Sequence, residues 1–288
     1  AATGDGVVAI LSADTLKVMH KTQVEGGGVP SLALNAAMEH FFIATKQSAM
    51  YLCELKTLTY ELRATCHSSP INDVAFPYGY SDLFVTCAKS EIRVWSVSTR
   101  TELLRIRVPN LECLCVTFSR DGKSILSGWD DGKIRAFRPQ SGQPLFVIND
   151  AHRDGVTALA VTFDGTRIIS GGECGQIRVW HVHGNATRML ASMKEHKAKV
   201  NFLQLSADNT ECVSASDDGS CVVWSLERYS RNICLFASTQ FKAVLYHPDQ
   251  SQLLTAGSDR KVSYWDVVDG SPIRILDGSQ DDTITTLD

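Results

Sequence analysis

Short runs of alternating apolar and polar residues cover most of the chain, and Gly, Asp and Ser separate them, which is typical of β-strands joined by tight turns. The clearest unit predicts a strand over 167–170, a turn over Gly172–Gly175 and a second strand over Gln176–Trp180. This unit recurs with aromatic ends at Trp95, Phe137, Trp180, Trp224 and Trp265, at steps of 42, 43, 44 and 41 residues. Such a period predicts an all-β propeller of four-stranded blades.

The residues before the regular units carry weaker forms of the same repeat. Counting back from Trp95 by one period, and then by another, leads to Cys53 and Leu11. Both lie in apolar runs that do not end in an aromatic residue. We therefore divide the chain into residues 1–62, with two less regular repeats, and residues 63–288, with five regular repeats and the first strand of another.

Both ends of the chain resemble parts of a blade. Ala1–Gly6 resembles the turn between the second and third strands of a repeat, and Thr283–Asp288 resembles a first strand. The chain is thus expected to begin inside one blade and to end inside another. It does not start with Met, so an interior segment of a longer protein is expected, with rings of seven blades.

Composition narrows the classes of protein that fit. Hydrophobic residues make up 44% of the 288, which is enough for a packed core. With 28 basic and 32 acidic residues the formal net charge is −4, so neither nucleic acid nor an anionic membrane is expected as a partner. No apolar run approaches the roughly 20 residues of a membrane-spanning helix. The nine cysteines include no Cys-x-x-Cys pair, which favours reduced thiols in the cytoplasm over disulfides or zinc.

Motifs that accompany nucleotide or metal chemistry are missing from the sequence. There is no Gly-x-x-x-x-Gly-Lys-Ser/Thr loop, and no Gly-x-Gly-x-x-Gly follows a predicted strand. His181 and His183 form the only close histidine pair, and their position at a strand exit suits solvent better than a metal. The sequence therefore predicts no cofactor, no metal, no small-molecule substrate and no enzymatic activity.

The repeats resemble the WD-repeat family along essentially the whole chain. Members carry a His before the first strand of a blade, a Ser or Thr on the second strand, an Asp in the next turn and a Trp on the third strand. One repeat matches fully, with His196, Ser214, Asp218 and Trp224. In this set the carboxylate can accept from the imidazole, the imidazole from the hydroxyl and the hydroxyl from the indole N–H. A Ser-His-Asp set also suggests a hydrolase, but no nucleophile elbow accompanies it, so the structural interpretation is preferred.

The other regular repeats keep only part of this set. Cys174 replaces the Asp in one repeat, Phe137 replaces the Trp in a second, and the His is missing from a third. The predicted members that remain are His152, Ser170 and Trp180, then Ser127 and Asp131, and finally Thr255, Asp259 and Trp265. The fold prediction rests on the period, which these departures leave unchanged.

The same resemblance implies where a partner would bind. In WD-repeat proteins, residues that flank the first apolar position of the first strand, and the residue before the turn Asp, often point to the top rim of the ring. Trp129 is a candidate interface anchor, and the alternative is a ring folded over the blade edge. The mixture of charges predicts a protein groove rather than a polyanion site. Carried onto this sequence, the rim residues are Asn72, Glu112, Trp129, Asp130, Thr157, Glu173, Lys199, Asn201, Asp217 and Lys242.

Several strings resemble one group within this family, the WD-repeat proteins of the ciliary axoneme. They include Ile71–Pro77 and Asp121–Ile125, with Phe137 in place of Trp and Val108–Asn110 where a His is expected. This resemblance implies a non-enzymatic scaffold of motile cilia and flagella that binds tubulin and other axonemal proteins inside the B-tubule of doublet microtubules. It implies a location in the cytoplasm, the cytoskeleton and the axoneme, and two propellers, the first ending within residues 1–62. The alternative is a soluble cytosolic adaptor that binds a peptide on the top face of the propeller.

Overall fold

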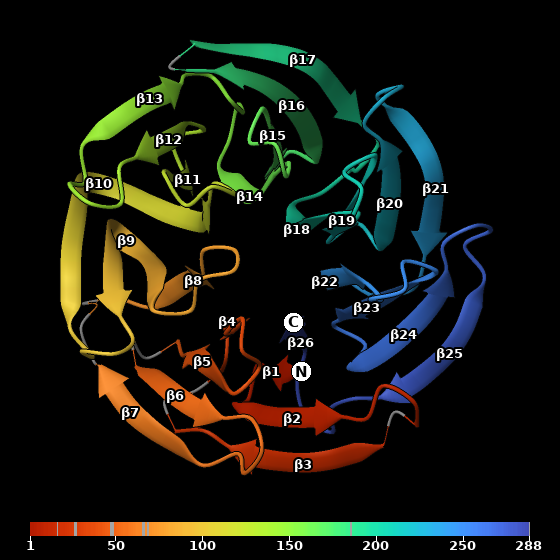
Figure 1. Cartoon of the computed structure of the whole chain (residues 1–288). Helices are drawn as coiled ribbons and strands as arrows, with labels where there is room; N and C mark the ends of the chain where they lie inside the picture. Colours follow the sequence, from red (N-terminus) through yellow and green to blue (C-terminus); the bar gives the residue numbers. More distant parts are fainter. Residues whose placement is uncertain are drawn as a thin grey trace.

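The computed structural model describes residues 1–15, 17–25, 28–46, 49–64, 67, 69–184 and 186–287. These residues contain no helix, and thus none that could span a membrane. Hydrogen bonds group their strands into six sheets that stand around a central axis as a ring (Figure 1). The predicted all-β propeller is therefore confirmed.

Four of the sheets contain four strands in chain order, from the axis of the ring to its outer edge. Each strand is antiparallel to the next, and the predicted hairpin is present, with Ile168 opposite Trp180. The four sheets are β4 (Ser31–Leu34), β5 (His40–Ala44), β6 (Met50–Glu54) and β7 (Tyr60–Ala64); β14 (Val156–Val161), β15 (Arg167–Gly172), β16 (Gln176–His183) and β17 (Ala186–Lys194); β18 (Val200–Leu205), β19 (Glu211–Ser216), β20 (Ser220–Ser225) and β21 (Ser230–Phe236); and β22 (Phe241–Tyr246), β23 (Gln252–Gly257), β24 (Lys261–Asp266) and β25 (Pro272–Asp277).

A fifth sheet has six strands and carries two repeats of the sequence period. One part of β10 pairs with β9 and the other with β11, so this strand runs from the outer edge of one repeat to the axis in the next. Asn110 bends β10 where a loop was expected, with a left-handed backbone (φ 63°) that Asn tolerates. The ring thus contains six hydrogen-bonded sheets but seven four-stranded blades, because β10 joins two blades into one sheet. The strands are β8 (Ile71–Ala75), β9 (Leu83–Ser96), β10 (Glu102–Phe118), β11 (Ile125–Trp129), β12 (Ile134–Phe137) and β13 (Pro144–Ile148).

The remaining sheet combines both ends of the chain, in the order β26-β1-β2-β3. Its strands are β26 (Ile284–Thr286), β1 (Ala2–Thr3), β2 (Val7–Leu11) and β3 (Val18–Gln23), and Ala2 pairs with Thr286. The expectation that the chain begins in one blade and ends in another is therefore wrong. Each end has the sequence pattern of an incomplete blade. The two ends pair with each other although nearly the whole chain lies between them, so no local sequence pattern indicates this pairing. The described residues among 1–62 lie in the same ring as the regular repeats, and Asp288 lies outside the described residues.

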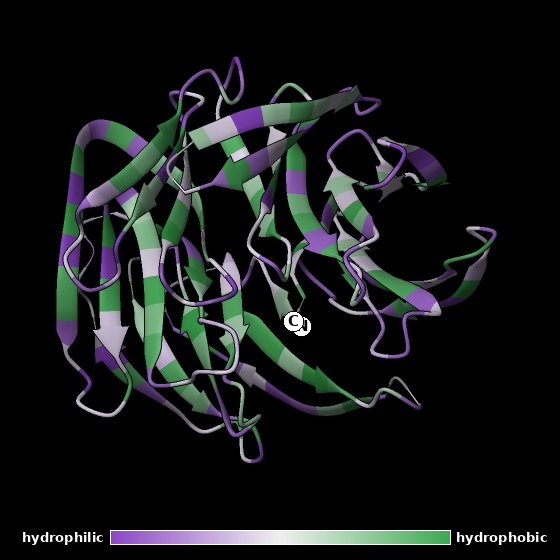
Figure 2. Cartoon of the chain, turned by 45° about the horizontal axis from the view of Figure 1, so that its top comes forward, coloured by the Kyte–Doolittle hydropathy of each residue, from purple (hydrophilic) through white to green (hydrophobic). Residues whose placement is uncertain are grey.

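Apolar side chains pack between neighbouring sheets. Ala158 and Ile177 from one sheet meet Val200 and Trp224 from the next in a single buried cluster. Figure 2 shows hydrophobic positions along the strands and hydrophilic positions in many of the connecting loops. Because a sheet inside the ring is covered on both faces, its central strands are apolar runs, and all six residues of β20 are buried. Cys66 lies outside the described residues, and each of the eight cysteines within them is a free thiol.

Candidate functional site

The four matching residues of the complete repeat meet in one buried network. Trp224 Nε1 donates to Ser214 Oγ at 2.8 Å, and Ser214 Oγ lies 2.7 Å from His196 Nε2. The other imidazole nitrogen, Nδ1, lies 2.8 Å from Ser220 Oγ and 3.2 Å from Asp218 Oδ2. Sequence reasoning missed Ser220. Ser214 is fully buried, so its hydroxyl is out of reach of a substrate and serves to join strands.

A second network of this kind, which sequence reasoning also missed, lies at the start of the six-stranded sheet. Trp95 Nε1 donates to Thr86 Oγ1 at 2.9 Å, and Thr86 Oγ1 lies 2.7 Å from His67 Nε2. His67 Nδ1 contacts Glu91 Oε1 at 2.8 Å, so a glutamate replaces the turn aspartate. Glu91 also pairs with Arg93 at 2.8 Å. The His, Thr and Trp have nearly the spacing of the complete repeat, which was the available signal, but the missing Asp concealed it.

The network of the sheet β14–β17 is incomplete. His152 Nε2 lies 2.8 Å from Ser170 Oγ, which accepts from Trp180 Nε1 at 3.1 Å. Because Cys174 stands at the Asp position, the buried Nδ1 of His152 has no hydrogen-bond partner within the described part of the chain. Burial lowers the pKa of His152 to about 4, and the neighbouring charge of Arg178 acts in the same direction. The imidazole is therefore neutral at neutral pH.

Cys174→Asp is expected to raise the free energy of unfolding by about 1–2 kcal/mol, because the new carboxylate would accept from Nδ1 of His152. Asp218 makes this contact in the next sheet, so Asp218→Cys is the matched reverse change and should lower stability by a similar amount. Urea denaturation of both variants measures the two shifts. If Cys174→Asp is no more stable than the wild type and Asp218→Cys is no less stable, the turn residue does not have this role.

Trp129 corrects the predicted rim. Its side chain is 0% exposed, and its Nε1 donates to Ser127 Oγ at 2.8 Å. Side chains two residues apart on a strand share a face, so Trp129 makes the contact that Phe137 cannot make from the third strand. Asp131 has no imidazole to meet and instead pairs with Arg135 at 2.6 Å. Trp129 is therefore a core residue and is removed from the candidate rim.

Hydroxyl groups replace the missing histidine in the sheet β22–β25. Trp265 Nε1 donates to Thr255 Oγ1 at 2.8 Å, as in the other sheets. The turn is held by Thr239, whose Oγ1 accepts from the backbone N–H of Asp259 at 3.0 Å and lies 3.2 Å from Ser258 Oγ. The indole and the second-strand hydroxyl thus stay together even where the imidazole is absent.

Three predicted rim residues bond to the next blade around the ring. Asn72 Nδ2 donates to the carbonyl oxygen of Cys113 at 2.8 Å, and Asn201 Nδ2 to that of Phe241 at 2.7 Å. Thr157 Oγ1 donates to a backbone carbonyl of β18 at 2.5 Å. These groups join neighbouring blades near the axis, so their polar atoms are already engaged before any partner binds.

The charged rim residues fall into two sets. Lys242 forms an ion pair with Asp217, and Glu112 Oε1 accepts from Asn72 at 3.0 Å. These charges are largely neutralised or held within the ring. The exposed members of the predicted rim are Asp130, Glu173 and Lys199. They stay candidates for contact with a partner.

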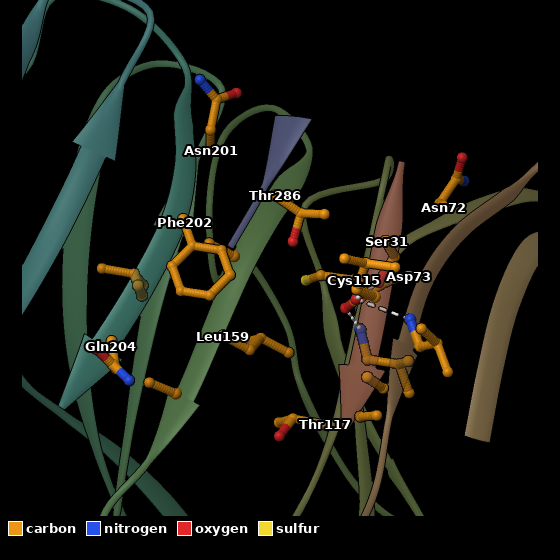
Figure 3. Close-up of a pocket in the computed structure, with 18 of the residues that line it drawn as sticks. Ser31, Asn72, Asp73, Cys115, Thr117, Leu159, Asn201, Phe202, Gln204 and Thr286 are labelled. Atoms are coloured by element: carbon orange, nitrogen blue, oxygen red, sulfur yellow. Dashed lines mark hydrogen bonds between the residues drawn. The ribbon is translucent and has the colours of Figure 1, made fainter. Parts of the chain in front are cut away.

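The inner strands enclose a channel that contains a cavity of about 560 Å³. Figure 3 shows Asn72 and Asn201 toward one end of this cavity and Thr117 and Gln204 toward the other. Its lining combines polar side chains with apolar ones such as Leu159. The described residues contain no group of three or more His, Cys, Asp or Glu that could hold a metal ion.

Asp73 contacts three strands at the channel wall. Its carboxylate accepts from the backbone N–H of Val74 at 2.8 Å and of Val116 at 2.9 Å, which links β8 to the inner part of β10. Ser31 Oγ lies 3.4 Å away on β4. Burial of the carboxylate removes it from water and raises its pKa to about 6, although the residue as a whole is only half-buried. These contacts make Asp73 a structural link between sheets.

The ring and its repeated Trp-to-hydroxyl contacts define a WD-repeat propeller. The family model described as "WD domain, G-beta repeat" matches residues 142–181, 187–225 and 236–266. These three segments are therefore WD repeats.

The chain is similar to cilia- and flagella-associated protein 52. The identity is 45% over 286 residues to the protein of Bos taurus, 46% over 286 residues to that of Mus musculus and 50% over 287 residues to that of Chlamydomonas reinhardtii. Each alignment covers 99% of this chain and 46% of the relative, so the chain spans about half the length of the curated relatives it matches. The predicted resemblance to ciliary WD-repeat proteins is confirmed.

Proposed function

We propose that the chain is a non-catalytic structural part of cilia or flagella, a protein of the doublet-microtubule lumen that binds tubulin and neighbouring axonemal proteins in the B-tubule. The observation that carries this proposal is 45–50% identity, over 99% of the chain, to proteins named for their association with cilia and flagella. The names of these relatives support a ciliary or flagellar location. The departures at Phe137 and Val108–Asn110 point to the same group of proteins.

The physical properties of the ring suit a structural role. Ser and His side chains that form active sites in other folds are here hydrogen-bonded to each other and join strands, as Ser214 and His196 show. Tubulin is acidic and this chain has a formal net charge of −4, so overall charge does not favour association. Binding therefore depends on shape and on single cationic side chains such as Lys199, and we expect only moderate weakening by salt.

The proposal is tested by co-sedimentation with fragments of axonemal doublet microtubules. The chain should enter the pellet in a saturable manner, and the amount bound at saturation should be proportional to the amount of doublet microtubule. A heat-denatured sample and singlet microtubules, which have no B-tubule, serve as controls. The proposal fails if the folded chain stays in the supernatant at every salt concentration. Affinity capture that recovers ligase or kinase subunits without tubulin would instead favour the cytosolic adaptor.

A further inference from the structure

The turn between the first and second strands of each repeat places one residue on the same face of the ring. In three consecutive repeats this residue is large, and in the others it is small or a proline. The equivalent residues, in chain order, are Ala36, Tyr78, Arg120, Phe163, Ala207 and Pro248. Because neighbouring repeats supply the three large side chains, they gather at one place instead of being spread around the ring.

The three large residues form a stack with a cation in the middle. The guanidinium of Arg120 lies over the ring of Tyr78 and 4.6 Å from the centre of the Phe163 ring. The two rings meet edge to face, with centres 6.2 Å apart. Stacking on two aromatic rings restricts the orientation of a guanidinium. Arg120 is thus held in position before any ligand arrives.

The cation lacks an anionic partner. Arg93 and Arg135 each pair with a carboxylate, whereas no hydrogen bond or ion pair to Arg120 is found within the described residues. Its Nε is buried and unpaired. Burial also lowers the pKa of Arg120, as expected for a cation that has lost water without gaining a counter-charge. A bound carboxylate would supply both the charge and the acceptor.

Exposed apolar surface adjoins the cation. Tyr78 is 62% exposed, Phe163 59% and Tyr80 50%. Beside them a groove with a cavity of about 390 Å³ is lined by Pro77, Tyr80, Leu103, Phe118 and Pro139. Tyr and Arg are the residue types most often found at the centre of protein interfaces, where they contribute most of the affinity.

We propose that this face binds a segment of a partner protein in which a carboxylate side chain pairs with Arg120 and a neighbouring apolar side chain enters the groove. A single cation beside the ion pair of Asp121 with Lys123, on a chain with a net charge of −4, does not favour a polyanion. One cation beside an apolar groove fits a single carboxylate flanked by Leu, Pro or an aromatic residue. This binding face is separate from the rim residues and does not depend on the ciliary role.

Selection from a random peptide library displayed on phage tests the inference. The folded chain should enrich peptides with Asp or Glu next to an apolar residue. Affinity for the enriched peptide, measured by fluorescence anisotropy, should fall about tenfold or more in Arg120→Glu and clearly in Arg120→Gln and Phe163→Ala. Pro248→Glu places the same charge at the equivalent turn on the other side of the ring and should change affinity by less than about twofold.

Thermal unfolding controls for the integrity of each variant, and all four substitutions lie in exposed or half-exposed turns. A selection with no enriched peptide, or with no acidic consensus, would overturn the inference. The inference would also be overturned if Arg120→Glu left the affinity for the peptide unchanged, or if Pro248→Glu lowered that affinity as much as Arg120→Glu does. Because the selection contains no tubulin, its failure is distinguishable from failure to bind doublet microtubules.

Discussion

Trp129→Ala is expected to lower the free energy of unfolding by about 3–5 kcal/mol, the range found when large aromatic side chains are removed from a core. The indole is fully buried among Val85, Val116 and Phe137, and its N–H is bonded to Ser127. The substitution therefore leaves a cavity and removes the donor to Ser127 Oγ, which keeps only its own bond to the carbonyl oxygen of Arg135. Urea denaturation followed by circular dichroism measures the loss.

Two further variants separate the parts of this effect. Trp129→Phe keeps most of the volume but removes the N–H donor, so it should cost about 1–2 kcal/mol. Asp130→Ala alters the exposed neighbour and should change stability by no more than about 0.5 kcal/mol. If Trp129 were an interface anchor, Trp129→Ala would leave stability intact and weaken a partner instead. That result would contradict its placement in the core.

Acid is expected to destabilise the ring through its buried histidines. The pKa of His152 is lowered to about 4 in the folded chain, against about 6.5 when unfolded, so between these values only the unfolded chain takes up a proton. The contribution of His152 is fully present above pH 6.5 and is lost as the pH falls to about 4. It amounts to about 3 kcal/mol, and His67, with its pKa also lowered to about 4 by burial, acts in the same direction.

His152→Gln isolates this contribution, because the amide can still reach Ser170 but does not titrate. The variant should lose about 1.4 kcal/mol less stability per pH unit than the wild type between pH 6.5 and 4. Asp73, with its pKa raised to about 6, works in the opposite direction, so the difference between the two proteins is the quantity to compare. Equal slopes for wild type and variant would show that His152 is not held neutral by burial.

The sequence predicted the repeat and much of its internal bonding, because both depend on residues close together in the chain. The period located the hairpin that ends at Trp180, and the resemblance to the WD-repeat family implied the contact of Trp224 with Ser214. The alternation of side chains also contained the information that Trp129 lies on the same face as Ser127, but the aromatic residue was assigned to a turn. That error came from reading Gly128–Gly132 as a single loop.

Other features had no local cause in the sequence. The pairing of Ala2 with Thr286 closes the ring between residues at opposite ends of the chain. The bonds from Asn72 and Asn201 to the next blade depend on the distance between blades, which no single repeat specifies. The stack around Arg120 combines residues of three repeats and becomes visible only once those turns lie on one face.

Cryo-electron tomography of doublet microtubules, from cilia with and without this protein, tests the central claim most directly. Averaged maps should differ by a ring-shaped density against the tubulin wall inside the B-tubule, and the six-sheet ring described here should fit that density. Identical lumens in the two maps, or a lost density that lies outside the doublet, would contradict a structural role inside the microtubule.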